Sequence, residues 1–460
     1  MTDDLDVIIL AAGLGTRMKS QKIKILHRAA GRPIIDYVLD LAAEVCARPP
    51  VVIVGHQREE VQRHVGDRAR FAVQDPPRGT GHAAMMAEPF VSARNVLILS
   101  GDVPLARVET LRRLIDEHVR QQNALTMLTM KPADPAKYGR IVRAGDGSVL
   151  RIVEAKDASD EEKRIDEVNA GMYVFDAAQL FDNLQRVTPN NAQGEYYLTD
   201  VVSMIRDNGK RVGAVVVDDE LEALGVDSRS QLARAEAEIQ RRVVEKLMSE
   251  GVTFRNPATV VIDSTVSIGA DSVVYPFVTL EGKTSIGRDC VIEPNVHLID
   301  TTIGNDVHVN TGTVADDAVV EDEAMVGPYA HLRPGTRLGK HVKVGNFVET
   351  KKAVFGEGAK ASHLSYIGDA DVGADVNIGA GTITCNYDGV NKHKTTIEDG
   401  VFIGSDTQLV APVRVGKGAY VGAGSTITKD VPPDALATSR VPQKIREGWA
   451  IERRARLKKR

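Results

Sequence analysis

The first half of the chain alternates short, continuous apolar runs with segments of helical periodicity. The apolar runs cover residues 7–10, 51–54, 71–73 and 96–99. Strands that are apolar throughout and separated by helices are typical of a mainly parallel sheet with both faces covered. Ligands of such sheets bind at the carboxyl ends of the strands. We therefore expect an α/β domain whose site lies where the turn after residue 10 meets the segment 100–102.

A single helical stripe follows this region and marks a boundary in the chain. The apolar residues on one face of the predicted helix are Leu232, Ala235, Ile239, Val243 and Leu247. Gly251 follows as a plausible stop. The pattern predicts a first domain over residues 1–229, a linker helix over 230–250 and a second domain over 251–460.

Beyond residue 250 aliphatic residues recur at every sixth position, a period that fits neither an α-helix nor a half-buried strand. Three runs hold this phase: Ile262, Ile268, Val274, Leu280, Ile286, Ile292 and Leu298; Val314, Val320, Val326, Leu332, Leu338 and Val344; and Ile403, Leu409, Val415, Val421 and Ile427. The period predicts a parallel β-solenoid in which each hexapeptide forms one flat side with its aliphatic residue inward, and three sides close a coil of about 18 residues. The segment 385–395 interrupts the repeat and should leave the wall as a loop.

The turn after the first strand has the features of a phosphate-binding loop. Gly13 and Gly15 let backbone amides approach an anion, a helix N-terminus behind the turn would add partial positive charge, and Arg17 and Lys24 supply full charges. The spacing matches neither the Walker pattern nor the complete dinucleotide fingerprint. On this pattern alone, an ordinary strand-to-helix turn remains the alternative.

Composition narrows the classes of function. The chain of 460 residues has a formal net charge of -5, so no overall basic field exists to hold nucleic acid. Its three cysteines lack C-x-x-C spacing, which argues against a disulfide framework or structural zinc and fits a reducing compartment. Neither a signal peptide nor an apolar run of about 20 residues is present. We expect a soluble cytoplasmic protein with small-molecule partners, no nucleic acid, no membrane insertion, and a solvated basic tail after Trp449.

Several motifs occur together along nearly the whole chain. They are LAAGLGTRM at 10–18, Gln74, Gly79-Thr80-Gly81-His82, GDVP at 101–104, Tyr138-Gly139-Arg140, VEAKD at 153–157, NAQGEYY at 191–197 and the hexapeptide array. With these motifs the chain resembles the family of bifunctional N-acetylglucosamine-1-phosphate uridyltransferases and glucosamine-1-phosphate acetyltransferases. The resemblance implies an α/β Rossmann-like nucleotidyltransferase domain followed by a left-handed parallel β-helix. It also implies a homotrimer with acetyl-transfer sites near the subunit junctions.

For the first domain the resemblance implies uridylyl transfer from UTP to N-acetylglucosamine 1-phosphate, with Mg²⁺ held by Asp102 and Asp227. The implied nucleotide- and sugar-binding residues are Leu10, Ala11, Ala12, Gly13, Arg17, Lys24, Gln74, Gly79, Thr80, Ser100, Gly101, Asp102, Gly139, Glu154, Asn169 and Asp227. Asp227 stands where the family usually has asparagine, Ile23 replaces a common proline and Ser100 a common aromatic residue. The extra charge of Asp227 should hold the metal at least as well.

For the second domain the resemblance implies acetyl transfer from acetyl-CoA to glucosamine 1-phosphate. The amine must lose a proton before it attacks, and imidazole suits that step because it exchanges protons near neutral pH. His363 is the expected base, with Glu349 orienting its ring. The implied acceptor-binding residues are Arg333, Lys351, Tyr366 and Asn377, and the implied acetyl-CoA-binding residues are Ala380, Asn386, Tyr387, Ser405, Ala423 and Arg440.

Two other classes of function remain as alternatives. The solenoid could serve only as an oligomerisation scaffold for a sugar nucleotidyltransferase, in which case acetyl-CoA would not be consumed. A zinc-containing solenoid enzyme would need three converging histidines, for which His331, His341 and His363 are the candidates. The spacing of these histidines gives no clear convergence.

Overall fold

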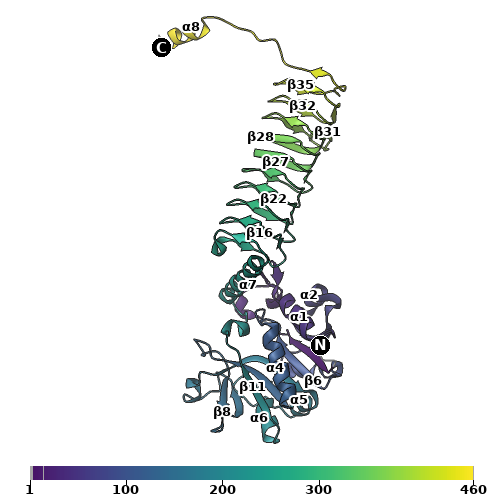
Figure 1. Cartoon of the computed structure of the whole chain (residues 1–460). Helices are drawn as coiled ribbons and strands as arrows, with labels where there is room; N and C mark the ends of the chain where they lie inside the picture. The colour runs from purple at the N-terminus through teal and green to yellow at the C-terminus, as the bar shows by residue number, and fades with distance from the viewer. Residues whose placement is uncertain (1–3, 14, 459–460) are drawn as a thin grey trace. The chain divides into compact units, whose positions relative to one another are not determined.

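The computed structural model describes residues 4–13 and 15–458. Leu14 of the glycine-rich motif and Lys459 and Arg460 of the basic tail lie outside the described residues. The chain divides into two compact units, residues 1–242 and 243–460. Figure 1 traces the order of the elements along the chain. Among the described residues, no helix combines the length and apolarity that a membrane span requires.

The described part of the first unit is built on a mixed nine-stranded sheet. Its main path runs β11-β7-β10-β6-β1-β4-β5, and β8 and β9 extend it beside β10. The strands are β1 Leu5–Leu10, β4 Val51–Val54, β5 Arg70–Val73, β6 Asn95–Ser100, β7 Leu125–Met130, β8 Arg140–Arg143, β9 Val149–Val153, β10 Val168–Asp176 and β11 Val212–Val216, and a separate pair is β2 Arg28–Ala29 with β3 Arg32–Pro33. The helices are α1 Ile34–Val45, α2 Arg58–Val65, α3 Thr80–Met85, α4 Val108–Arg120, α5 Ala177–Leu184, α6 Asp200–Asp207 and α7 Arg229–Ser249.

The parallel centre of this sheet agrees with the apolar pattern. β1 runs parallel to β4 and β6, whereas β10 runs antiparallel to β6 and β7. Successive residues of β1 enter two different cores, Val7 and Ile9 one core and Ile8 the other. Because both faces of β1 are covered, the strand is apolar at every position except Asp6, whose buried carboxylate accepts hydrogen bonds from the backbone amides of Ser92 and Ala93. The carboxyl ends of β1 and β6 therefore meet at one edge.

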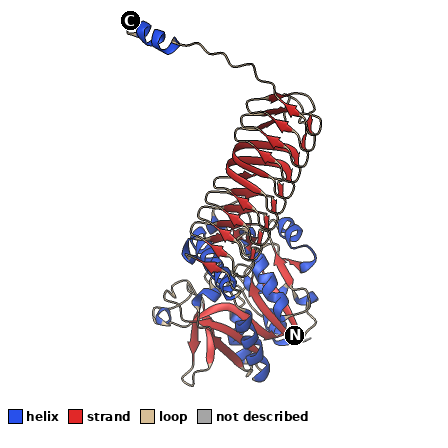
Figure 2. Ribbon diagram, turned by 45° about the horizontal axis from the view of Figure 1, so that its top comes forward, coloured by secondary structure: helices blue, strands red, loops and turns tan. Residues whose placement is uncertain are grey.

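The second unit begins within α7 and continues as a parallel β-helix (Figure 2) that has three flat sides, which we name A, B and C. Side A consists of β12 Thr253–Phe254, β15 Val273–Val274, β18 Val291–Ile292, β21 His308–Val309, β24 Met325–Val326, β29 Asn377–Ile378, β32 Phe402–Ile403, β35 Tyr420–Val421 and β37 Leu436–Ala437. Side B consists of β13 Val261–Ile262, β16 Thr279–Glu281, β19 His297–Ile299, β22 Val314–Asp316, β25 His331–Leu332, β30 Ile383–Cys385, β33 Gln408–Val410 and β36 Thr426–Ile427. Side C consists of β14 Ser267–Ile268, β17 Ser285–Ile286, β20 Thr302–Ile303, β23 Val319–Val320, β26 Arg337–Leu338, β31 Thr395–Ile397 and β34 Val413–Val415. Two long strands, β27 Lys343–Phe355 and β28 Lys360–Val372, turn through all three sides.

The six-residue period predicts the inward positions correctly except at Val314. That residue is half-buried, and Ala315 lies inward in register with Leu298. The inward position advances by only five residues from Leu298 to Ile303. The same five-residue step recurs from Ala315 to Val320, so counting back six residues from Val320 selects Val314 instead of the inward Ala315.

The corner between sides A and B, here called the A–B corner, turns at one residue per coil with a positive φ. These residues are Phe277, Asn295, Gly312, Tyr329, Phe347, Leu364, Gly381, Asp406 and Gly424. Glycine, asparagine and aspartate adopt this left-handed conformation readily, whereas bulky residues do so at a cost. Tyr329, Phe347 and Leu364 are nevertheless between 55% and 64% exposed there.

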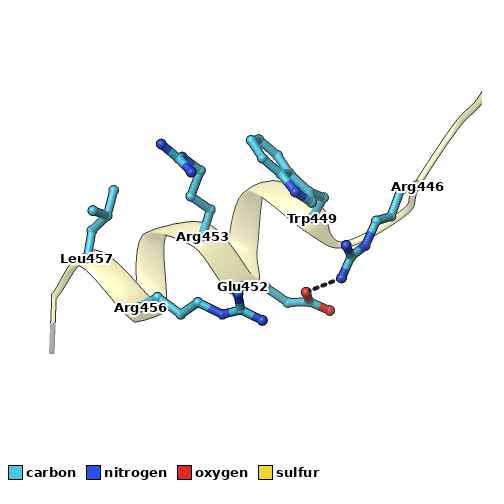
Figure 3. A pocket seen from close by; sticks show the side chains of 6 residues that line it. All are labelled: Arg446, Trp449, Glu452, Arg453, Arg456 and Leu457. Carbon is cyan, nitrogen blue, oxygen red and sulfur yellow. Dashed lines mark hydrogen bonds and ion pairs between the residues drawn. The ribbon is translucent and has the colours of Figure 1, made fainter.

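Two segments depart from the β-helix wall. Residues 386–394 form the predicted loop between β30 and β31, closed by a bridge between Tyr387 and Lys392. The basic tail contains a helix, α8 Trp449–Leu457, with no buried residue, as expected of a solvated segment. Figure 3 shows a hollow on α8 where Arg446 pairs with Glu452 at 2.8 Å and Arg453 lies over the Trp449 ring. This hollow comes from the helix and the residues just before it.

Replacing Phe355 tests the packed column of the β-helix. Its side chain is 1% exposed, so Phe355→Ala should lower the free energy of unfolding of the second unit by about 3–5 kcal/mol. Denaturant unfolding measures this change. The neighbouring Val354, 43% exposed, provides the control Val354→Ala, which should have a much smaller effect. Equal effects of the two substitutions would contradict an inward Phe355.

Candidate active sites in the two units

A cavity of about 510 Å³ lies at the carboxyl ends of β1 and β6 in the first unit. The predicted residues that line it are Leu10, Ala11, Ala12, Gly13, Arg17, Lys24, Gln74, Gly79, Thr80, Ser100, Asp102 and Asp227. Sequence reasoning did not select Thr16, Ile25, Pro77, Ala83 and Glu195, which also line it. Thr16 and Glu195 belong to motifs recognised in the sequence, so their position inside those motifs was the available signal.

Two glycines give the cavity its walls. Gly15 has φ +62°, and a Cβ there would lie 2.8 Å from the Cβ of Lys24. Gly79 has φ +104°, and a Cβ there would lie 2.6 Å from the carbonyl oxygen of Tyr196. Any other residue at either position would push these segments apart.

The helix expected behind the glycine turn is only the three-residue 3₁₀ helix η1, Thr16–Met18. So short a helix adds little dipole, because few peptide units are aligned. The prediction of a helix N-terminus at this turn is therefore wrong. The positive charge of the cavity comes instead from the side chains of Arg17 and Lys24.

Asp102 and Asp227 converge on the ammonium group of Lys24. Lys24 Nζ donates to an oxygen of Asp102 and, at 2.9 Å, to Oδ1 of Asp227. Arg17 Nη2 lies 2.9 Å from Oδ2 of Asp227. Burial alone would lower the pKa of Lys24, but the two carboxylates outweigh burial and raise this pKa. The ammonium is therefore firmly charged.

This pair of carboxylates fits Mg²⁺, which binds proteins through one or two carboxylates and completes its shell with water and phosphate oxygens. The described residues contain no cluster of three or more histidine, cysteine, aspartate or glutamate side chains suited to a metal. His331, His341 and His363 thus form no metal-binding triad there. A site with two carboxylates suits a metal that arrives with a phosphorylated substrate.

Gln74 is buried beside the cavity, and its amide nitrogen is already engaged. Gln74 Nε2 donates to the carbonyl oxygen of Gly79 at 2.9 Å and lies 3.1 Å from Nδ1 of His82. These contacts use the amide protons and fix the side chain. The carbonyl oxygen Oε1 is then the group that can accept a hydrogen bond from a base.

Gly139, Glu154 and Asn169 form a group outside the residues that line the cavity. The Asn169 amide donates to the Gly139 carbonyl oxygen at 2.8 Å, and Thr199 donates to Glu154 Oε1 at 3.0 Å. Burial raises the pKa of Glu154, the Thr199 hydrogen bond opposes this change, and Asp157 and Asp200 add to it. Gly101 also lies outside the lining, and its amide donates to the Leu10 carbonyl oxygen at 2.9 Å.

In the second unit, His363 lies at the A–B corner, in register with Asn346 of the coil before it. Its side chain is exposed and so does not enter the packed interior. The next corners are joined through backbone hydrogen bonds from Gly381 to Leu364 at 2.8 Å, from Asp406 to Ala380 at 2.7 Å and from Gly424 to Ser405 at 2.8 Å. Arg440 Nη1 then donates to the Ala423 carbonyl oxygen at 2.8 Å. His363, Ala380, Ser405, Ala423 and Arg440 therefore follow one another on successive coils of one corner.

A second group of predicted residues lies on side B and at the corner where the chain leaves side B. Tyr366 is in register with Glu349, and Lys351 with Gly368. Asn386 Nδ2 donates to Asp369 Oδ2 at 2.5 Å and to the Tyr366 hydroxyl at 3.4 Å. This group joins the wall to the loop 386–394.

The same side B group is rich in positive charge. Contact with the Lys392 ammonium lowers the pKa of Lys351, and the nearby Arg333 adds to this effect. Arg333 Nη1 donates to Glu349 Oε1 at 2.7 Å. Three cations thus gather where an anionic group could bind.

The structure gives the positions of three further predicted residues of this unit, Glu349, Asn377 and Tyr387. Glu349 binds Arg333 and lies opposite Tyr366, so within one chain the structure does not pair it with His363. Asn377 is on side A, in register with Lys360 and Phe402. Tyr387 is exposed on the loop, where its hydroxyl donates to the Gly389 carbonyl oxygen at 2.6 Å. The structure does not bring Asn377 and Tyr387 into the side B group.

The two units and their sites define a class of protein, a nucleotidyltransferase joined to a hexapeptide-repeat transferase. Family models agree: residues 6–226 match "Nucleotidyl transferase" and residues 394–429 match "Bacterial transferase hexapeptide (six repeats)". The chain is 51% identical over 444 residues to the bifunctional protein GlmU of Heliobacterium modesticaldum, with 96% of this chain and 97% of that protein covered. It is 48% identical over 473 residues to the bifunctional protein GlmU of Geobacter sulfurreducens, with 98% and 99% covered.

The chain therefore belongs to the family of bifunctional GlmU proteins. Members of this family are bifunctional transferases, and this chain is accordingly an acetyltransferase and a uridyltransferase. The resemblance to this family that the sequence motifs indicated is confirmed. The predicted fold class, an α/β nucleotidyltransferase domain followed by a parallel hexapeptide-repeat region, is also confirmed.

The environment of Glu154 gives a test of the first site. Asp200→Asn should lower the pKa of Glu154 because it removes a neighbouring negative charge, and Thr199→Val should raise this pKa because it removes a hydrogen bond to the carboxylate. A pH titration of the Glu154 carboxyl by ¹³C NMR measures both shifts. Asp160→Asn, an exposed position paired with Lys163, is the control and should leave the pKa unchanged. Shifts of the same sign in the first two variants would contradict this arrangement.

Proposed function

We propose that the two units catalyse successive steps toward UDP-N-acetylglucosamine. The second unit transfers acetyl from acetyl-CoA to glucosamine 1-phosphate, and the first unit transfers uridylyl from UTP to the N-acetylglucosamine 1-phosphate so formed. One observation carries the proposal. In the first unit, Arg17 and Lys24, which can neutralise phosphate, line one cavity. In the second unit, the exposed imidazole of His363 lies at the first of several successive coil corners that carry the predicted acetyl-CoA-binding residues.

In the first unit, a phosphate oxygen of the sugar phosphate attacks the α-phosphorus of UTP. The new phosphorus–oxygen bond forms as the bond to the β-phosphate breaks, and pyrophosphate leaves. Arg17 and Lys24 hold the triphosphate, and the glycine-rich turn offers backbone amides. Gln74 accepts a hydrogen bond from the uracil ring. Glu154 and Asn169 contact the sugar.

Mg²⁺ bound by Asp102 and Asp227 would supply further positive charge to the phosphates. Lys24 occupies the space between these carboxylates and keeps their repulsion low. Lys24 and Arg17 both contact the Asp227 side chain. Lys24 contacts both carboxylates and so holds the pair together until the substrates arrive.

In the second unit, His363 takes a proton from the amine of glucosamine 1-phosphate. The amine lone pair attacks the thioester carbonyl carbon, the carbon–sulfur bond breaks, and coenzyme A leaves as the thiol after gaining a proton. Arg333 and Lys351 bind the sugar phosphate, and Tyr366 and Asn377 bind its hydroxyl groups. Ala380, Asn386, Tyr387, Ser405, Ala423 and Arg440 form the path for acetyl-CoA.

We also propose that the protein assembles as a homotrimer through the A–B corner. Tyr329 and Phe347 stack with ring centroids 5.6 Å apart, and Leu364 follows on the next coil. All three are bulky, exposed residues with positive φ on consecutive coils. Phe277 is a fourth such residue but stands apart from them, and the remaining coils have glycine, asparagine or aspartate at this position. A conformational cost combined with exposed apolar surface is explained if a second copy covers this ridge. The ridge adjoins His363, so the acetyl-transfer site is complete only between copies.

A cytoplasmic location completes the proposal. The cysteines Cys46, Cys290 and Cys385 are all unpaired, which suits a reducing compartment. Burial raises the pKa of the Cys290 thiol, and burial also raises that of Cys385, so both thiols are poorly reactive. Direct acetyl transfer needs no thiol nucleophile.

Substitutions in each unit test whether the two reactions occur at separate sites. His363→Ala should reduce acetyl transfer by about 10²–10⁴-fold because it removes the base, and should spare uridylyl transfer. Asp102→Ala should reduce uridylyl transfer by about 10²–10³-fold and spare acetyl transfer. Thiol release from acetyl-CoA and pyrophosphate release from UTP measure the two reactions.

His341→Ala is the control for this pair, since His341 is also exposed on the β-helix but pairs with Glu323 at 3.4 Å. It should leave both rates unchanged. Loss of both activities from His363→Ala or from Asp102→Ala would contradict separate sites. Wild-type protein that releases no thiol from acetyl-CoA would favour the scaffold alternative.

The ridge at the A–B corner is tested by Phe347→Asp. Aspartate tolerates a positive φ, so each copy should fold, but a charge on the ridge should dissociate the trimer and abolish acetyl transfer. Light scattering gives the oligomeric state. Phe277→Asp, at the same corner but separated from the ridge by Asn295 and Gly312, should leave a trimer. A Phe347→Asp protein that stays trimeric would refute this interface.

A further inference from the structure

A second cavity in the first unit adjoins the nucleotide cavity. Its volume is about 480 Å³, and Arg17 lines both cavities. The other charged residues that line it are Lys137, Arg234, Asp134 and Glu220. Nothing in the proposed uridylyl transfer uses this cavity.

The positive charges of the second cavity are more available than the negative ones. Glu220 accepts a hydrogen bond from the backbone amide of Ala133 at 2.9 Å, and Asp134 accepts one from the amide of Ala136 at 3.0 Å. Both carboxylates are therefore engaged in holding the loop that precedes β8. Lys137 and Arg234 form no ion pair with any carboxylate in residues 4–13 and 15–458.

The start of α7 adds to this positive field. Ser228, Ser230 and Gln231 line the cavity at the N-terminus of a 21-residue helix. The Gln231 backbone amide donates to Ser228 Oγ at 3.3 Å, and Gln231 Oε1 accepts from Ser228 Oγ at 2.9 Å and from the Asp227 backbone amide at 3.1 Å. Ser228 therefore caps the first turn of α7. The cap fixes the first turn, and the dipole of a helix this long favours an anion beside it.

Arg17 couples the two cavities. Its guanidinium contacts Asp227 Oδ2 at 2.9 Å, and its side chain is 64% exposed. An exposed guanidinium can change partners at little cost, since solvent replaces the contact it leaves. An anion in the second cavity therefore competes with Asp227 for Arg17.

We propose that the second cavity binds inorganic pyrophosphate as it leaves the nucleotide cavity. The inference rests on the proposed uridylyl transfer, which releases this anion beside Arg17. The cations of the second cavity come from three separate segments, namely the turn after β1, the loop before β8 and α7. An anion with charge at both ends meets more of them than a single phosphate does.

Pyrophosphate binding to the full chain tests the site directly. In EDTA, which prevents the reverse reaction, equilibrium binding of labelled pyrophosphate should give two sites per chain. Lys137→Ala/Arg234→Ala should weaken one of them about tenfold or more, because two charged contacts are lost. Lys131→Ala/Arg164→Ala removes the same charge outside both cavities and should keep two sites.

Three results of this titration would overturn the proposal. They are fewer than two sites in the wild type, unchanged binding in Lys137→Ala/Arg234→Ala, and equal weakening in the charge-matched control. Inorganic phosphate tested in the same way should bind the second site at least about tenfold more weakly than pyrophosphate. Equal affinities would overturn the choice of a diphosphate.

The kinetics of uridylyl transfer provide an independent test of the second site. Without added pyrophosphate, Lys137→Ala/Arg234→Ala should transfer uridylyl at the wild-type rate. Added pyrophosphate should inhibit the wild type more strongly than this variant, because the wild type also holds the anion in the second cavity, where it competes for Arg17. Equal inhibition of the wild type and this variant would overturn the proposal. A chain that transfers no uridylyl would refute the proposed function, and the binding titration would still decide the second site.

Discussion

Hydrogen bonding between parallel strands decides where both candidate sites lie. In the first unit, pairing of β1 with β6 brings the glycine-rich turn and Asp102 to one edge, although about 90 residues separate them. In the second unit, each coil must return to the ladder of the coil before it, so residues at one corner repeat along that corner. His363 and Arg440 belong to one column for this reason. The chemistry depends on side chains, but their convergence depends on the backbone.

Charged side chains determine the electrostatics of the first site. Two carboxylates near each other would repel, and the nucleotide brings more negative charge, so the cavity needs cations before any substrate binds. Lys24 and Arg17 meet this need, and the raised pKa of Lys24 reflects it. Arg17 also faces a second cavity, whose cations lie outside the reacting groups. Arg17 is thus a cation that both cavities share.

The spacing of hydrophobic residues predicted the architecture, because backbone geometry sets the spacing of buried positions in each kind of element. It could not predict β10, which runs antiparallel at the centre of the sheet, because strand direction depends on the long connection from β9. It also misplaced the inward residue at Val314, since a coil can close with one residue fewer. For the sites, motifs located Lys24, Asp102 and His363. Pair contacts such as Arg333 with Glu349 join different coils, and only the register of the coils determines them.

The loop 386–394 leaves the wall between two coils that remain in register, with Ala370 opposite Thr395. Since the ladder resumes beyond it, the wall does not require any particular loop length. Natural variation can lengthen, shorten or exchange this segment while the aliphatic column stays intact. Changes in this loop can therefore alter the contacts that Asn386 and Tyr387 are proposed to make with the acetyl donor, while the packed column of the wall is retained.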